Sequence, residues 1–406
     1  MKTLNVTLLI FLLLPLGANA VALEGRGEVE FNGTSAETDT DAITLFLLLD
    51  GSVYLESLSE NWKYKASIAA LYDETNGAQL RPGEINAQIQ TDKFIFTAGY
   101  QTISWGENFG LNPVDIINPN VPNNFFEDNA DKSKESSPLL NLKVISGNFD
   151  INVLGGATLS QKVNDSSTNL GLNTETTAAS KIFFEGLGER DTELLMAAKI
   201  GVLISNWADV SVFGAVHGNR TPRFSARAGT DGTSFEQMNN QNHSSGLSFS
   251  LPVYDGVLRG DSILTSTDKN PTYFAGETET YSFSVGYDYA KTISNVMLTL
   301  GVQSMYSQTE DFDSGEITYS RPSGLQGVID LYDYGSKVTV IYLKDYSRID
   351  TYLMKLGYSY VFKEDNKVSL SYNKVSTSSE SSLSSDFFSF VVGERDLITL
   401  NYTRYL

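Results

Sequence analysis

The chain is dominated by segments in which apolar and polar residues alternate. In the segment 280–289, Tyr281, Phe283, Val285, Tyr287 and Tyr289 share one face, and Thr, Ser, Gly and Asp occupy the other. The segment 352–362 repeats this pattern with a Tyr, Met, Leu and Phe face, and the segments 62–72 and 368–373 follow it as well. Because successive side chains of a strand point to opposite sides, this period of two predicts β-strands with one apolar face.

The apolar faces are suited to lipid. Each segment has about the 9–11 residues that a tilted membrane-crossing strand needs. A soluble sandwich alternates too, but here Tyr, Phe and Trp flank the apolar positions, as an interfacial girdle requires. The opposite faces carry Gly, Ser, Thr and Asn, which suit a water-filled interior.

The connections between these segments alternate between short and long. Short turns rich in Gly, Asn, Asp and Ser include 91–93, 146–148, 254–256 and 291–295, whereas 105–138, 160–190 and 218–242 are long. Outer-membrane barrels have short periplasmic turns and long outside loops. This alternation predicts an all-β, transmembrane, antiparallel up-and-down β-barrel of about 18 strands, with 16 as an alternative because the segment 178–187 is ambiguous.

The predicted strands fall between these connections. They are 22–32, 41–58, 61–73, 83–91, 94–104, 138–146, 149–159, 191–204, 208–217, 243–252, 256–266, 278–290, 295–307, 324–333, 336–346, 349–362, 366–377 and 395–406.

The first 20 residues predict a secretory signal peptide. Lys2 precedes an apolar run from Leu4 to Leu16, and Ala18-Asn19-Ala20 fits the cleavage pattern. We therefore expect a signal peptide at 1–20, a barrel domain at 21–406, and a location in the outer membrane of a Gram-negative bacterium. The formal charge is −20, and losing Lys2 makes it −21, which argues against nucleic acid as a partner. The chain has no Cys, which excludes disulfides and Cys-based metal sites.

The C-terminus predicts a further partner. Ile398, Leu400, Tyr402 and Leu406 share a face of a strand that ends at the last residue. This resembles the C-terminal signal read by the barrel-assembly machinery, although that signal usually ends in Phe and Arg404 stands where an apolar residue is usual. Other expected partners are outer-membrane lipids, lipopolysaccharide, a small solute and further copies of the chain.

The longest informative connection is 105–137. It is too apolar to lie free in water, and long loops in compact domains are usually functional. We expect it to fold into the lumen and narrow it, with packing over the rim or against a partner as the alternatives. Its candidate constriction or ligand residues are Trp105, Glu107, Phe109, Asn112, Asp115, Asn118, Phe125 and Phe126.

This stretch also resembles a family. The run G-x-Q-x-I-x-W-G-E followed by L-N-P-x-D-x-I-N-P, over roughly 94–120, is similar to a group of large proteobacterial outer-membrane proteins of poorly assigned function. Some of these are associated with hydrophobic compounds such as alkanes or lipids. The resemblance implies a porin-like barrel and, as one alternative, transport of hydrophobic molecules.

Charged residues on the less apolar strand faces are candidate lumen charges, because rings of charge in a pore select solutes. They are Lys63, Lys65, Lys143, Lys199, Arg259, Asp261, Asp288, Asp345 and Lys355. Solvated side chains without selectivity are the alternative.

Other chemistry is thinly supported. The carboxylates in 311–316 have calcium-like spacing but lack the rest of a binding loop, so no metal and no cofactor is expected. A barrel hydrolase needs Ser and His together, and only His217 and His243 are present. We therefore expect no enzyme but a channel for passive or facilitated diffusion of small solutes. A transporter of hydrophobic compounds and a structural or adhesive barrel are the alternatives.

Overall fold

The computed structural model describes most of the predicted strands and parts of the connections. The described residues are 24–35, 47–56, 62–73, 77–108, 111–118, 134, 136–161, 190–205, 207–218, 223–229, 232–238, 241–268, 277–312, 315–331, 335–346, 352–362, 366–376 and 395–405. Among them, no helix is long and apolar enough to cross a membrane.

The described elements are all strands. They are β1 (Glu24–Ser35), β2 (Leu47–Glu56), β3 (Trp62–Asp73), β4 (Gly77–Gln90), β5 (Phe94–Gln101), β6 (Ser137–Ser146), β7 (Phe149–Gln161), β8 (Arg190–Ile204), β9 (Ala208–His217), β10 (Arg223–Gly229), β11 (Gly232–Met238), β12 (Asn242–Val253), β13 (Gly256–Thr267), β14 (Thr278–Ile293), β15 (Val296–Asp311), β16 (Ile317–Ser320), β17 (Pro322–Leu331), β18 (Ser336–Asp345), β19 (Tyr352–Phe362), β20 (Asn366–Ser376) and β21 (Arg395–Tyr405).

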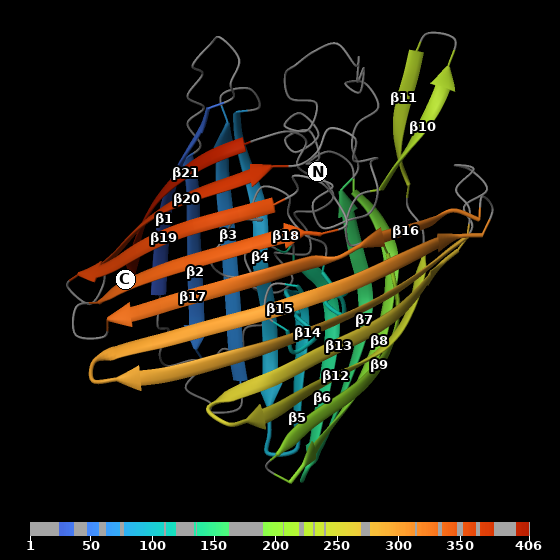
Figure 1. Ribbon diagram of the computed structural model, residues 1–406, viewed down its shortest axis with the longest axis horizontal. Coiled ribbons are helices and arrows are strands. Elements are labelled where there is room, and N and C mark those ends of the chain that lie inside the picture. The colour runs from blue at the N-terminus through green and yellow to red at the C-terminus, as the bar shows by residue number, and fades with distance from the viewer. Residues whose placement is uncertain are drawn as a thin grey trace, which may run out of the picture.

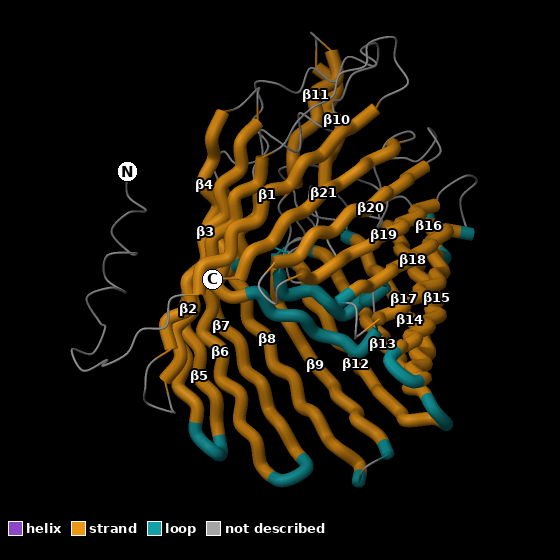
Figure 2. The backbone as a smooth tube through the Cα atoms, turned by 90° about the vertical axis from the view of Figure 1, so that its left-hand side faces the viewer, coloured by secondary structure: helices purple, strands orange, loops and turns teal. Residues whose placement is uncertain are grey.

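Nineteen of these strands form one antiparallel sheet that closes on itself, and β10 and β11 form a separate two-stranded hairpin. Within the large sheet neighbours along the chain pair, except that β17 pairs with β15 rather than β16, and β9 pairs with β12 across the hairpin. The sheet closes where β21 pairs with β1, from Arg26↔Tyr405 to Ser35↔Asp396. The 19 strands of the sheet fill eighteen positions in the described part, because β16 and β17 pair in succession with β15. The tilted wall encloses an interior (Figures 1 and 2). The predicted fold class is confirmed.

The two faces of the wall differ as the alternation predicts. On β8, Leu194, Met196 and Ile200 are about half exposed on the outside, whereas Leu195 and Ala197 are buried on the inside. The outward row recurs around the barrel. It includes Leu140, Leu142, Val144, Ile151, Val153, Val212, Leu247, Phe283, Val285, Leu300, Val302, Leu325, Ile329, Val340, Leu356 and Leu370. Such an apolar outer belt is the surface that lipid covers in membrane barrels.

The short connections gather at one end of the barrel (Figure 2). Several are two-residue hairpins with a left-handed residue, such as Gly147 at φ 59°, Tyr254 at φ 53° and Ser294 at φ 54°. This conformation gives a hairpin turn the twist of its strands. The first residue of β1, Glu24, and the last residue of β21, Tyr405, both lie at this end of the barrel, with the short turns.

Three stretches predicted as loop are strand instead. Residues 77–82 extend β4 and pair with β3 as far as Gly77↔Asp73, with a register shift opposite Ala66 and Ile68. The segment 223–238 forms the β10–β11 hairpin, which projects beyond the barrel (Figure 1), and 317–320 forms β16. The signal peptide at 1–20 and the ambiguous segment 178–187 lie outside the described residues.

Candidate functional site

The segment that follows β5 packs against the inner face of the wall. Trp105, Val114 and Ile117 join a buried cluster with inward side chains of β6, β7, β8, β9 and β13. The wall contributes Leu139, Leu154, Leu195, Ala197, Phe213, Ala215 and Ile263 to this cluster. The indole of Trp105 lies 5.5 Å from the Phe213 ring, at a tilted angle that suits aromatic pairs. The apolar character of the segment is therefore satisfied by the barrel interior.

Asn118, at the far end of this segment, is hydrogen-bonded back to the end of β5. Its side chain is fully buried; it accepts from the Ile103 amide at 2.6 Å and donates to the Gln101 carbonyl at 2.9 Å. Gln101 in turn donates to the Leu139 carbonyl at 2.8 Å. A buried amide bonded in this way holds the segment in one conformation, because breaking any bond leaves a desolvated polar group.

A buried ion pair holds the middle of the segment. The Asp115 carboxylate lies 2.5 Å from the ammonium of Lys134, and both side chains are almost fully buried. Lys134 also donates to the Ser104 hydroxyl. Asn112 donates to the Trp105 carbonyl at 2.5 Å and accepts from the Val114 amide at 3.1 Å, which closes the turn locally.

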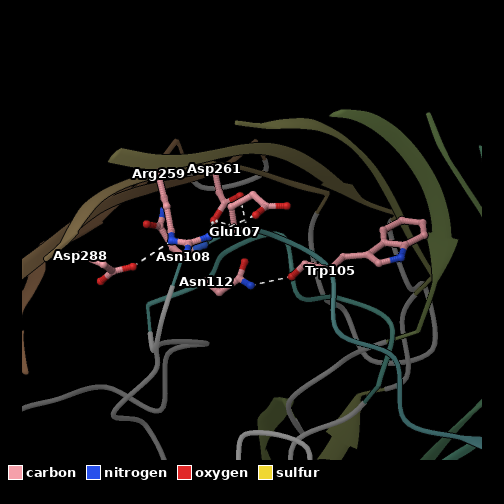
Figure 3. A network of polar contacts seen from close by, with 7 residues as sticks. All are labelled: Trp105, Glu107, Asn108, Asn112, Arg259, Asp261 and Asp288. Atoms are coloured by element: carbon pink, nitrogen blue, oxygen red, sulfur yellow. Dashed lines mark hydrogen bonds and ion pairs between the residues drawn. The ribbon is translucent and has the colours of Figure 1, made fainter. Parts of the chain in front are cut away.

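The Asp261 carboxylate on β13 anchors the tip of the segment. It accepts the backbone amide of Glu107 at 3.0 Å and that of Asn108 at 2.9 Å, and its side chain is 2% exposed. The side-chain amide of Asn108 donates to the Ser284 hydroxyl on β14 at 2.7 Å. Gly286 leaves room for this contact, because a Cβ there would lie 2.7 Å from the Asn108 oxygen. Figure 3 shows Glu107, Asn108 and Asp261 meeting at the wall.

Charged groups of both signs surround the same tip. Arg259 on β13 donates to Asp288 at 2.8 Å and to Glu107 at 3.4 Å, and all three side chains stay partly exposed (Figure 3). Burial raises the pKa of the Glu107 carboxyl above its ordinary value. Lys199 and Arg259 act against this rise, whereas Asp209 and Asp261 add to it.

The remaining candidate lumen charges lie elsewhere along the wall. Lys65 is paired with Glu84, and Lys143 lies 3.6 Å from Asp150. These pairs join neighbouring strands of the described wall. Lys63 is exposed near the start of β3, and Lys355 is buried on the inward face of β19.

Asp345 is the last residue of β18 and accepts hydrogen bonds from the end of β16 and the residue after it. Its carboxylate is fully buried and accepts from the Ser320 hydroxyl and the Arg321 amide, each at 3.0 Å. It therefore bonds the junction between β16 and β17.

The structure thus gathers part of the predicted set. Trp105, Glu107, Asn112, Asp115 and Asn118 lie in one segment, and Lys199, Arg259, Asp261 and Asp288 lie near its tip. Phe109, Phe125 and Phe126 lie outside the described residues.

The candidate residues did not include Gln101, which stands in the quoted motif, nor Asn108 and Lys134. Asn108 sits next to Glu107 in the motif and could have been included with it. Nothing in the sequence links Lys134 to Asp115.

The two histidines occupy opposite faces of neighbouring strands. His217 is buried and lies 2.9 Å from the Ser244 hydroxyl, which is itself buried and 2.8 Å from Thr265. His243 is exposed and lies 3.3 Å from Asp268. A nucleophile has to reach its substrate, so the buried Ser244 is placed for structural hydrogen bonding. Within the described ranges, no group of three or more metal-ligating side chains is present.

Comparisons with known proteins concern the fold. No protein-family model matches the sequence, and no curated protein matches it significantly. Solved structures are similar to the barrel over nearly its whole length. The outer membrane protein opdK from Pseudomonas aeruginosa has a TM-score of 0.52 and 10% identity, covering 94% of this chain and 98% of that chain. Pseudomonas aeruginosa OpdL has a TM-score of 0.51 and 9% identity, covering 95% and 97%.

A third Pseudomonas aeruginosa structure, OccK11 (OpdR), agrees with these two. It has a TM-score of 0.50 and 10% identity, covering 95% of this chain and 94% of that chain. At such low identity the likeness shows the fold alone, and the family resemblance of the W-G-E motif stays a prediction. The chain therefore has the fold of a porin-like outer-membrane β-barrel.

Proposed function

We propose that this chain is an outer-membrane channel through which small solutes pass by passive or facilitated diffusion. The signal peptide at 1–20 exports it, and the barrel-assembly machinery inserts it among outer-membrane lipids and lipopolysaccharide. A closed wall with an apolar outer belt supports this proposal, because only such a sheet crosses a bilayer without unpaired backbone groups. Assembly with further copies of the chain is compatible with it.

The observation that carries the proposal is the anchoring of the stretches 102–108 and 111–118 inside the barrel. Asp261 takes two consecutive backbone amides of the segment, and Glu107, Arg259 and Asp288 stay partly exposed beside them. A fixed backbone that presents partly exposed charges into a lumen has the properties of a constriction. The constriction residues are thus Glu107 and its partners on β13 and β14.

Transport of hydrophobic compounds is the weaker alternative. Its binding site would need apolar side chains that are open to the lumen. Leu111, Val114 and Ile117 are at most 1% exposed, because they are packed against the wall or their own segment. Among the described residues, the apolar part of this segment serves to hold it in place.

Conductance in a planar lipid bilayer tests the proposal. The purified chain should give stable open steps with a preference for cations, and the absence of conductance would overturn the channel function in favour of a structural barrel.

A matched pair of variants tests the anchor. Asp261→Asn weakens the acceptor of both amides, so we expect larger current fluctuations and faster exchange of the Glu107 and Asn108 amide hydrogens. Asp288→Asn removes the charge of a carboxylate that pairs with Arg259 and does not bond the segment's backbone, so it should leave that exchange unchanged. Equal behaviour of the two variants would contradict the anchoring role.

A further inference from the structure

Aromatic side chains line the outer face of β14–β16 towards the end with the long connections. Phe283 lies 6.1 Å from Tyr281 and 5.6 Å from Tyr306, and Tyr306 lies 6.2 Å from Tyr319. On the next strands, Tyr342 stacks on Tyr352 at 6.4 Å. Aromatic rings on the outside of a membrane barrel mark the level where acyl chains meet headgroups.

Two cations lie within this aromatic row, since Tyr352 pairs directly with Lys344 and Tyr346 lies opposite Arg321. On β18 the outward-facing residues are Val340, Tyr342 and Lys344, in order towards the end with the long connections. The Lys344 ammonium lies 5.7 Å from the Tyr346 ring. On β17 the row runs from Ile329 through Leu325 to the residue before the strand, Arg321, whose guanidinium lies 5.4 Å from the Tyr306 ring. The four strands β15–β18 face the viewer in Figure 1.

The two cations are close enough to act together. Ser323 is directly opposite Lys344, and the Tyr346 amide donates to the Arg321 carbonyl at 3.1 Å, so the two cations are diagonal neighbours across the strand pair. Such positions are about 7–8 Å apart at their Cα atoms. The chain as a whole is acidic, yet neither cation forms an ion pair within the described ranges. Glu310 also faces outward, on β15, and no ion pair joins it to Arg321.

Position and charge together identify a ligand. A cation at the headgroup level attracts anionic groups, and Arg and Lys are the usual phosphate-binding side chains. The aromatic rings beside them are suited to pack against acyl chains at the same level. We propose that Arg321 and Lys344, with Tyr306 and Tyr346, form a binding site for the phosphate groups of lipopolysaccharide in the outer leaflet. The inference rests on the proposed outer-membrane location.

Native mass spectrometry of the full chain in detergent tests the site, with lipid A carrying both phosphates as the probe. The double variant Arg321→Gln/Lys344→Gln should bind the probe about tenfold more weakly, since each cation near such a surface contributes on the order of a few-fold. Lipid A without phosphates should bind the wild type and the variant equally. The variant Arg321→Lys/Lys344→Arg keeps both charges and should retain most of the binding.

The matched control is Lys93→Gln/Lys291→Gln, which removes two exposed lysines at the turn end of the barrel. It should bind lipid A as the wild type does. Equal loss in the control, or unchanged binding in the Arg321 and Lys344 variant, would overturn the site. A change in subunit number instead of lipid binding would assign the surface to contacts between copies and would also overturn it. Conductance is measured separately in phospholipid bilayers without lipopolysaccharide, so failure of the channel function remains distinguishable.

Discussion

The strand pairs β8–β9 and β14–β15 have similar outer faces but different inner faces. Outside, both are apolar, with Met196 and Val212 on one pair and Val285 and Leu300 on the other. Inside, β8–β9 carries Leu195 and Phe213 under the inward-folded segment. The inner side of β14–β15 is mostly small or polar, with residues such as Ser282, Ser284, Gly286, Gln303 and Ser307.

The difference shows that two separate demands shape one wall. Lipid requires apolar residues on the outside of every strand. On β8–β9 the inside is apolar where Trp105, Val114 and Ile117 pack on it, because an apolar lumen wall left in contact with water gains nothing from burial. The apolar inner face of β8–β9 therefore marks the place where the segment lies inside.

Removing the segment should have the largest effect on this comparison. Deleting Leu111 to Phe126 removes Val114, Ile116 and Ile117 from the buried cluster and leaves Trp105 and Glu107 without the part of the segment that packs behind them. We therefore expect single-channel conductance to rise by about twofold or more, because Glu107 is no longer held in the lumen. Planar-bilayer recording measures this. An unchanged conductance would show that the segment does not limit flow.

Exchanging the character of the two inner faces should have an intermediate effect. Leu195→Ser makes the β8–β9 face resemble β14–β15 and should loosen the segment by roughly 3 kcal/mol, the cost of losing a fully buried Leu side chain. Hydrogen exchange of the amides at 105–108 measures this loosening. Ser307→Leu makes the reverse change on β15 and should leave the exchange at 105–108 unaltered; if it does not, the two faces are not independent.

Acidification should produce the smallest effect. Burial raises the pKa of Glu107, so this carboxyl takes up its proton at a higher pH than an ordinary glutamate as the pH falls. Its negative charge beside Arg259 is then lost, and the preference for potassium over chloride should fall in that pH range. Reversal potentials across a salt gradient measure the preference. Glu107→Gln should show the lower preference already at neutral pH and lack this step.

The strand pattern was predictable because lipid and turns impose strong local rules. The bounds of β9 agree with the prediction at both ends, and most other strands differ by a few residues. The β10–β11 hairpin was missed although Asp231-Gly232 is a strong turn signal between alternating residues. Residues 77–82 were predicted to lie in a connection but belong to β4, where Pro82 is an unusual residue within a strand.

The candidate site was predictable only in part. The apolar content of 105–137 indicated that the segment needs cover, and several predicted residues do contact the wall. Its partners were not predictable, because Asp261 lies 154 residues from Glu107 and only the closed sheet brings them together. Asp261 was predicted as a charge open to the pore, whereas its buried carboxylate bonds the backbone of the segment.

The pairing of β1 with β21 has a consequence for how the molecule is made. Its partners, such as Arg26 and Tyr405, come from the two extremes of the chain, so this seam has the largest sequence separation of any strand pair in the described sheet. Contacts of that kind form late, because the intervening chain must be ordered first. Until then β1 and β21 are open edges that invite pairing with other chains. A chain truncated before β21 would therefore keep β1 as an unpaired edge that is open to pairing with other chains.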